Sequence, residues 1–113
     1  MAIATGAAAS RVDLTIQAGA LFSVVVPDVD TGNTSSSKFE IRTRDGRVLL
    51  SIAQGAPVTI GFLRFEATDV ETAALRARFG DFPAFYDVRV RYTDASYDRL
   101  QEGAIGLSYG VSE

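Results

Sequence analysis

Hydrophobic and polar residues alternate along much of this chain with the two-residue period of a β-strand. Such alternation predicts strands that bury one face and expose the other. The segments that show it are residues 12–17, 38–43, 48–52, 58–65 and 84–93. A mostly apolar run over residues 20–26, which ends with β-branched valines before Pro27, predicts a further strand. Another strand is expected from Tyr97 towards Tyr109.

Turn-forming residues separate these segments. Asp45-Gly46 predicts a hairpin with a type I′ turn, in which both central residues take positive φ. The polar stretch over residues 27–37 predicts a long loop. The alternation changes phase at Gly61 and again near Gly103, which predicts a β-bulge or a tight reversal at each glycine.

A single short helix is predicted over residues 69–79. Thr68 and Glu71 have the spacing of a capping box, in which each side chain accepts from the other residue's backbone N–H. Asp69 and Glu71 are explained as first-turn acids that the helix dipole favours, rather than as a catalytic pair. Gly80 stands where a helix commonly ends. The face expected to pack on a sheet consists of Val70, Ala73, Ala74 and Ala77.

Together these elements predict an all-β fold, an antiparallel β-sandwich of about seven strands with one short helix. The length of 113 residues suits one domain. We assign the alanine-rich residues 1–11 to an N-terminal arm and residues 12–113 to a single sandwich domain.

The residue types that the chain lacks exclude several kinds of chemistry. It has no Cys and no His, so it forms no disulfide, no thiolate metal site and no His-dependent catalytic triad. A net charge of −3 is opposite to the Lys/Arg excess that nucleic-acid binding uses. The sequence also lacks the ~18 consecutive apolar residues of a membrane-spanning helix. We therefore expect a protein that is not an enzyme, with no cofactor and no nucleic-acid or membrane partner.

Two groups of side chains are candidates for binding. Asp28, Asp30 and Asn33 partly match an acidic calcium loop, but the ligand and glycine positions of that motif are not met, and turn chemistry explains the same residues. Tyr97 and Tyr109 suit stacking on a sugar or on another protein, if they are exposed.

Charged residues on the predicted sheet also have two interpretations. The cations of a possible basic strip are Lys38, Arg42, Arg89 and Arg91. Glu40 and Asp87 alternate with these cations, which favours cross-strand ion pairs over a free basic surface.

Four segments, in their order and spacing, resemble small immunoglobulin-like β-sandwich proteins of tailed bacteriophage virions, similar to the N-terminal domain type of the baseplate upper protein. They are residues 13–19, residues 39–42 with 45–46 and 48–50, residues 71–75, and residues 86–88 through 99–103. The resemblance covers most of residues 12–107. It implies an immunoglobulin-like sandwich and carries no catalytic residues.

The resemblance also implies a function, that of a virion structural protein. Such a protein decorates or cements the capsid, or acts as an adaptor in the neck, tail or baseplate. Its partners would be other virion proteins, including the major capsid protein, and copies of itself, assembled in the cytoplasm of the bacterial host. The alternative is a glycan- or host-surface-binding module of a phage fibre or spike. Candidate partner-binding residues are Ile3, Thr5, Ala8, Asp28, Asp30, Asn33, Tyr97 and Tyr109.

Overall fold

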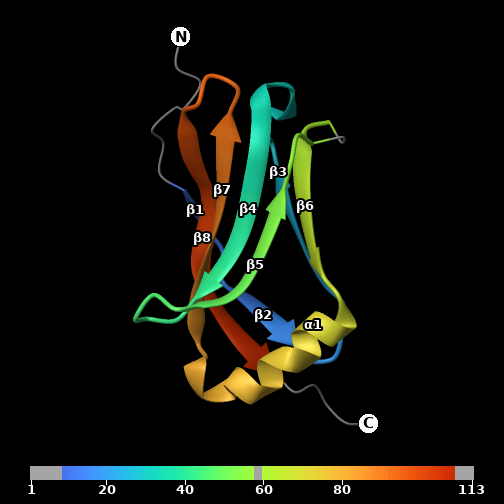
Figure 1. The fold of residues 1–113 in the computed structure, drawn as a ribbon, viewed down its shortest axis with the longest axis vertical. Coiled ribbons are helices and arrows are strands. Elements are labelled where there is room, and N and C mark those ends of the chain that lie inside the picture. Colours follow the sequence, from blue (N-terminus) through green and yellow to red (C-terminus); the bar gives the residue numbers. More distant parts are fainter. Residues whose placement is uncertain (1–8, 58–59, 109–113) are drawn as a thin grey trace.

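The computed structural model describes residues 9–57 and 60–108, which fold into two packed β layers (Figure 1). The strands are β1 (Ser10–Arg11), β2 (Leu14–Gln17), β3 (Phe22–Pro27), β4 (Thr34–Arg42), β5 (Val48–Gln54), β6 (Phe62–Ala67), β7 (Ala84–Tyr92) and β8 (Tyr97–Ser108). The helical elements are η1 (Thr31–Asn33), α1 (Asp69–Ala74) and η2 (Leu75–Asp81), of which η1 and η2 are 3-10 helices.

The larger sheet has six strands and the smaller sheet has two. The larger sheet has the order β1-β8-β7-β4-β5, and β2 also pairs with β8. β1 and β2 run parallel to β8, whereas the other neighbours run antiparallel. β3 and β6 form the smaller sheet. The predicted β-sandwich is confirmed, with eight strands in the described residues. Ser10 and Arg11, assigned to the arm from the sequence, pair with Gln101 and Glu102 as β1.

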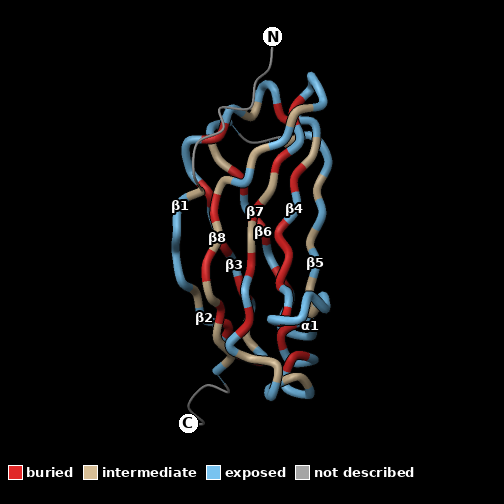
Figure 2. The backbone as a smooth tube through the Cα atoms, turned by 90° about the vertical axis from the view of Figure 1, so that its left-hand side faces the viewer, coloured by how far each residue is buried: buried red, intermediate tan, exposed pale blue. Residues whose placement is uncertain are grey.

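The core lies between the two sheets and is built largely from alternate residues of β3, β4, β6 and β7 (Figure 2). β3 and β7 show the pattern most clearly, since every second residue of each is buried. Phe39 lies at the centre of an aromatic group. Its ring centroid is 5.8 Å from that of Phe22, 6.0 Å from that of Phe65 and 5.3 Å from that of Tyr86. These contacts join β3, β4, β6 and β7, so one side chain couples both layers.

The β4–β5 hairpin is where the sequence predicts it, but its turn is of another type. Gly46 has a φ of 92°, whereas Asp45 does not have a positive φ. The Thr43 N–H donates to the Arg47 carbonyl at 2.8 Å, which leaves a three-residue connection. A three-residue hairpin needs one glycine in the left-handed region, whereas a type I′ turn needs two such residues. The hairpin is confirmed and the turn type is wrong.

Two predictions made from turn-forming residues need correction. The loop expected over residues 27–37 ends early, because β4 already begins at Thr34. Pairing with β7 overrides the loop preference of its serines, and the Ser35 hydroxyl donates to the Arg91 carbonyl at 3.0 Å. Gly61, with φ 85°, precedes β6 rather than interrupting a strand, and β3 pairs with β6 without a register shift. Residues 58–59 lie outside the described part.

The helix prediction is right about the start and wrong about the face. The Glu71 N–H donates to Thr68 Oγ1 at 3.1 Å and the Thr68 N–H donates to Glu71 Oε1 at 2.8 Å, which confirms the capping box. The α-helix ends at Ala74 and continues as η2, which includes Gly80. The small-residue face is exposed, with Val70 74% accessible. The buried positions are instead Thr72 in α1 and Leu75 at the start of η2. Thr72 is the buried residue of α1, so a polar side chain rather than an apolar face holds this helix.

Thr72 anchors α1. It is fully buried, and its hydroxyl donates to the Ala20 carbonyl at 2.7 Å and accepts from the Gly19 N–H at 3.1 Å. The helix is thereby bonded to the turn between β2 and β3.

We expect Thr72→Val to lower the free energy of unfolding by about 1–3 kcal/mol, because the exchange removes the hydroxyl that bonds the Gly19 N–H and the Ala20 carbonyl while keeping the side-chain shape. Urea denaturation measures this loss. Thr72→Ser keeps the hydroxyl and should retain most of the stability. Equal stability of the Val and Ser variants would show that the hydrogen bonds contribute nothing.

Gly103 does not mark the phase slip that the sequence predicts there. The β7–β8 register shifts between Val88, opposite Gln101, and Arg89, opposite Arg99, so Leu100 is the extra residue. Gly103 is required for another reason, since a Cβ atom there would lie 2.2 Å from the Val12 carbonyl oxygen. The glycine lets the segment between β1 and β2 approach β8 closely.

Candidate functional site

An apolar groove of about 570 Å³ runs between β3 and the β1–β2 segment. We call it the β3 groove. It is lined by Ser10, Val12 and Leu14 on one side, Val24, Val25, Val26, Pro27 and Asp28 on the other, and Leu100 and Gln101 of β8. Its walls come from strands of both sheets, and Gln101 of β8 is buried, so the groove belongs to the sandwich rather than to a surface loop.

β3 borders this groove with an unpaired edge. Within residues 9–57 and 60–108, the backbone of β3 pairs only with β6. An edge strand turns alternate N–H and C=O groups away from its partner, where they are available to another chain. Residues 21–26 carry no charge, and natural edge strands usually discourage such pairing with Lys, Pro or a bulge. Here only Pro27, at the end of the strand, does so.

The outer face of the larger sheet carries a network of ion pairs. Glu40 has a side chain only 7% exposed and lies 3.1 Å from Arg89, with Arg42 also in contact. Asp87 lies 3.2 Å from Arg99 and 3.5 Å from Arg89. Glu40 is directly opposite Asp87 in the register, so the cross-strand pairs Glu40–Arg89 and Asp87–Arg99 are diagonal. The other contacts join residues of one strand. Cross-strand ion pairing is confirmed for Arg89, whereas Lys38 and Arg42 pair with Glu40 along β4. Arg91 has no ion pair among the described residues and contacts the Tyr97 ring instead.

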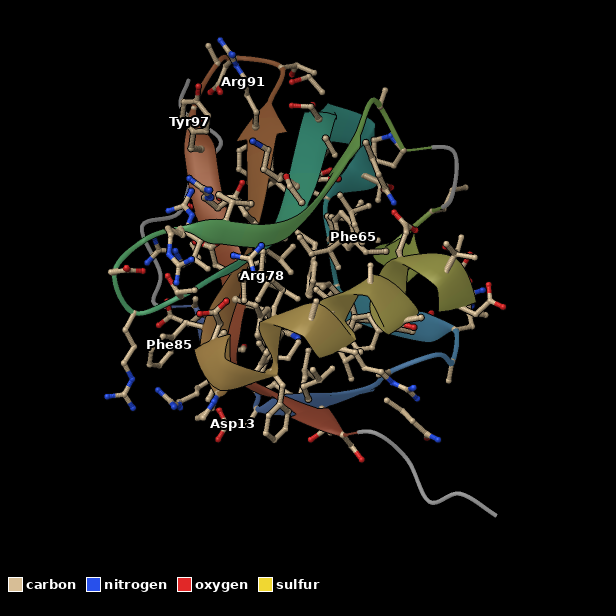
Figure 3. All side chains as sticks on the ribbon, turned by 60° about the horizontal axis from the view of Figure 1, so that its bottom comes forward. Asp13, Phe65, Arg78, Phe85, Arg91 and Tyr97 are labelled. Carbon is tan, nitrogen blue, oxygen red and sulfur yellow. The ribbon has the colours of Figure 1, made fainter. Side chains whose placement is uncertain are left out.

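A separate hollow of about 240 Å³ lies at the end of this face where β7 turns into β8. We call it the β7–β8 hollow. Its lining includes the cations Lys38, Arg89 and Arg91 together with Tyr97. Tyr97 is 62% exposed, and the Arg91 guanidinium lies 5.4 Å from its ring centroid. Figure 3 shows the two side chains together on β7 and β8.

The loop residues proposed for binding form a turn. The Asn33 side-chain amide donates to Asp30 Oδ2 at 2.8 Å, and the Thr34 hydroxyl donates to the Asp30 carbonyl at 2.9 Å. Asp28 has a φ of 59°, a left-handed conformation that Asp tolerates. Across the described residues, no three acidic side chains gather as a metal site would require. The remaining candidates, Ile3, Thr5, Ala8 and Tyr109, lie outside the described residues.

Two buried tyrosines fix the sheet rather than forming a site. The Tyr86 hydroxyl donates to the Val12 carbonyl and accepts from Gln101 Nε2 at 3.0 Å, and burial raises its pKa. Burial, with a hydrogen bond to Asp98 at 3.1 Å, raises the pKa of Tyr92 to about 12 from 10.0.

A raised tyrosine pKa favours the folded state while the phenol is neutral. The contribution of Tyr92 to the free energy of unfolding should be fully present below pH 10.0 and be lost as the pH rises towards about 12. We expect the urea midpoint of Tyr92→Phe to fall less across this window than that of the parent protein. Tyr86 contributes to the remaining fall. An identical decline in both proteins would contradict the assignment.

Sequence patterns identify Tyr97 as a candidate binding residue, but they identify neither the β3 groove nor the β7–β8 hollow. The uncharged run at residues 21–26 is the one local signal for the β3 edge, and it equally suits a fully buried strand. The β7–β8 hollow has no local signal, because its walls come from four different strands. No described helix is long and apolar enough to cross a membrane.

Comparison with known proteins identifies the fold. No protein-family model and no curated protein matches the sequence. Among solved structures, the chain is similar to the immunoglobulin-like domain of mouse leukocyte-associated immunoglobulin-like receptor 1, described as a strand-swapped dimer. The TM-score is 0.51 at 13% identity, over 87% of this chain and 88% of that chain. This likeness concerns the fold alone. The chain is an immunoglobulin-like β-sandwich.

Proposed function

We propose that this chain is a non-enzymatic structural protein of a bacteriophage virion that docks onto other virion proteins through the free edge of β3. The observation that carries the docking is an unpaired strand edge beside an apolar groove of about 570 Å³. Support for the virion setting comes from the resemblance of four ordered segments to phage sandwich proteins. Capsid decoration and a neck, tail or baseplate adaptor both fit this mode of docking.

The occupant that suits the β3 groove is an extended segment of a neighbouring virion protein. Six residues of β3 span about 20 Å, enough for a short strand to pair along it. Backbone hydrogen bonds would supply affinity, and alternate apolar side chains of the added strand would pack on Val12 and Leu14. Residues 21–26 carry no charge that would repel such a partner, and Asp28 contributes a negative charge to the groove lining at the end of the strand.

Docking through the β3 edge can be tested by introducing a single charged side chain. Val25 lies on the outer face of β3 and is 44% exposed, so Val25→Lys should leave the core intact while opposing strand addition. Val48, 49% exposed on the edge strand β5, provides a matched control. Each variant is produced during particle assembly and quantified in gradient-purified particles.

We expect Val25→Lys to reduce incorporation by at least about tenfold, with an unchanged thermal midpoint. Val48→Lys should be incorporated like the parent protein. Normal incorporation of Val25→Lys would contradict docking through β3. Equal losses in both variants would point to a general effect of surface charge instead.

A second candidate function is a glycan-binding module of a fibre or spike. It is favoured by the β7–β8 hollow, which places an exposed tyrosine among three cations. This surface lies on the larger sheet, whereas β3 belongs to the smaller one, so the two functions can be tested independently.

A further inference from the structure

The β7–β8 hollow combines charge and an aromatic ring in a small space. Its volume of about 240 Å³ is below the ~300–1,000 Å³ of pockets for drug-sized ligands. Ser36 and Ala53, two small residues, leave room between the longer side chains. The register places Ser36 opposite Arg91 and Arg91 opposite Tyr97, so one row across three strands forms part of the wall.

The cations of the hollow differ in how far they are already neutralised. Arg89 lies 3.1 Å from Glu40 and 3.5 Å from Asp87, which fixes its guanidinium. Lys38 lies 3.9 Å from Glu40, a long and partly exposed pair. Among the described residues, Arg91 contacts the Tyr97 ring and has no carboxylate within ion-pair distance. No acidic side chain of the described chain lines the hollow, so Arg91 is available to an anion there. Lys38 can turn towards the same anion because its pair with Glu40 is long.

We propose that the β7–β8 hollow binds a single acidic sugar residue, a pyranose that carries a carboxylate. The carboxylate would pair with Arg91 and Lys38, and the apolar face of the ring would pack on Tyr97. This inference rests on the second candidate function and is independent of docking through β3.

An acidic peptide fits this surface less well. β7 lies between β4 and β8 and is paired with both, so its backbone has no free edge for strand addition. A peptide would be held by its side chains alone. The small, single hollow matches one ring better than an extended chain.

Three soluble probes separate the contributions to binding. Amide chemical shifts of the full chain are followed during titration with glucuronate, glucose and acetate. We expect glucuronate to shift amides of Ser36, Lys38, Arg91 and Tyr97 with saturation, and glucose and acetate to bind at least about tenfold more weakly. Acetate binding as tight as glucuronate would overturn the proposal, since charge alone would then suffice. Tighter binding of a triglutamate peptide at the same amides would overturn it in favour of a protein partner.

Substitutions test which side chains are responsible for glucuronate binding. Tyr97→Ala and Arg91→Gln should each weaken glucuronate binding by at least about tenfold, whereas Arg64→Gln, an equal loss of charge on the smaller sheet, should leave it unchanged. Val25→Lys should also bind glucuronate normally, so failure of docking and failure of this site are distinguishable. Unaltered binding by Tyr97→Ala would exclude ring stacking and overturn the proposal.

Discussion

Phe39→Ala should lower the free energy of unfolding by about 3–5 kcal/mol, among the largest losses expected for the described core. Phe39 is fully buried and its ring contacts Phe22, Phe65 and Tyr86 across both sheets. Its removal leaves a cavity where the two layers meet, and neither sheet can close that space alone. Urea denaturation followed by circular dichroism measures the loss.

Phe85→Ala is the matched control. Phe85 lies on β7 but faces outward, is 42% exposed, and has the Arg44 guanidinium 5.8 Å from its ring centroid. We expect this variant to lose about 1 kcal/mol or less. A loss as large as that of Phe39→Ala would contradict the placement of the core between the two sheets.

Gly103→Ala should destabilise the protein by about 2–3 kcal/mol, although it adds a single methyl group. The new Cβ would lie 2.2 Å from the oxygen and 2.8 Å from the carbon of the Val12 carbonyl. Both atoms belong to backbone, which cannot rotate away. The same carbonyl accepts a hydrogen bond from the Tyr86 hydroxyl, so displacing it also disturbs a partly buried hydrogen bond.

Gly106→Ala tests the same substitution in the same strand without the clash. No atom lies within 4 Å of a Cβ built at Gly106. We expect its stability to be unchanged or slightly raised, because alanine restricts the unfolded chain. Equal stability of the two variants would show that the β1–β2 segment is not held against β8.

Local patterns were sufficient for most of the fold. The two-residue period located β7 and the β4–β5 hairpin, and the spacing of Thr68 and Glu71 located the start of α1. Each of these features depends on neighbours in the sequence. The immunoglobulin-like fold, also expected from the order of the segments, is supported by the structural comparison.

Features that depend on distant contacts escaped prediction. The prediction of the buried helix face is wrong because the Thr72 hydroxyl bonds to backbone groups 52 and 53 residues away. No local period in the sequence encodes such distant contacts. The bulge at Leu100 is set by pairing with β7 rather than by a glycine. The β7–β8 hollow collects residues between Ser36 and Tyr97 from four strands, so only the folded chain brings them together.

Quantitative mass spectrometry of gradient-purified particles from the source lysate tests the central claim most directly. The amount of this chain is measured against that of the major capsid protein. A virion structural protein should be present at a fixed ratio to the major capsid protein across independent preparations. The value of that ratio separates a decoration protein from a neck or baseplate component. Absence of the chain from the particles, with the protein recovered free in the lysate, would contradict the proposed function.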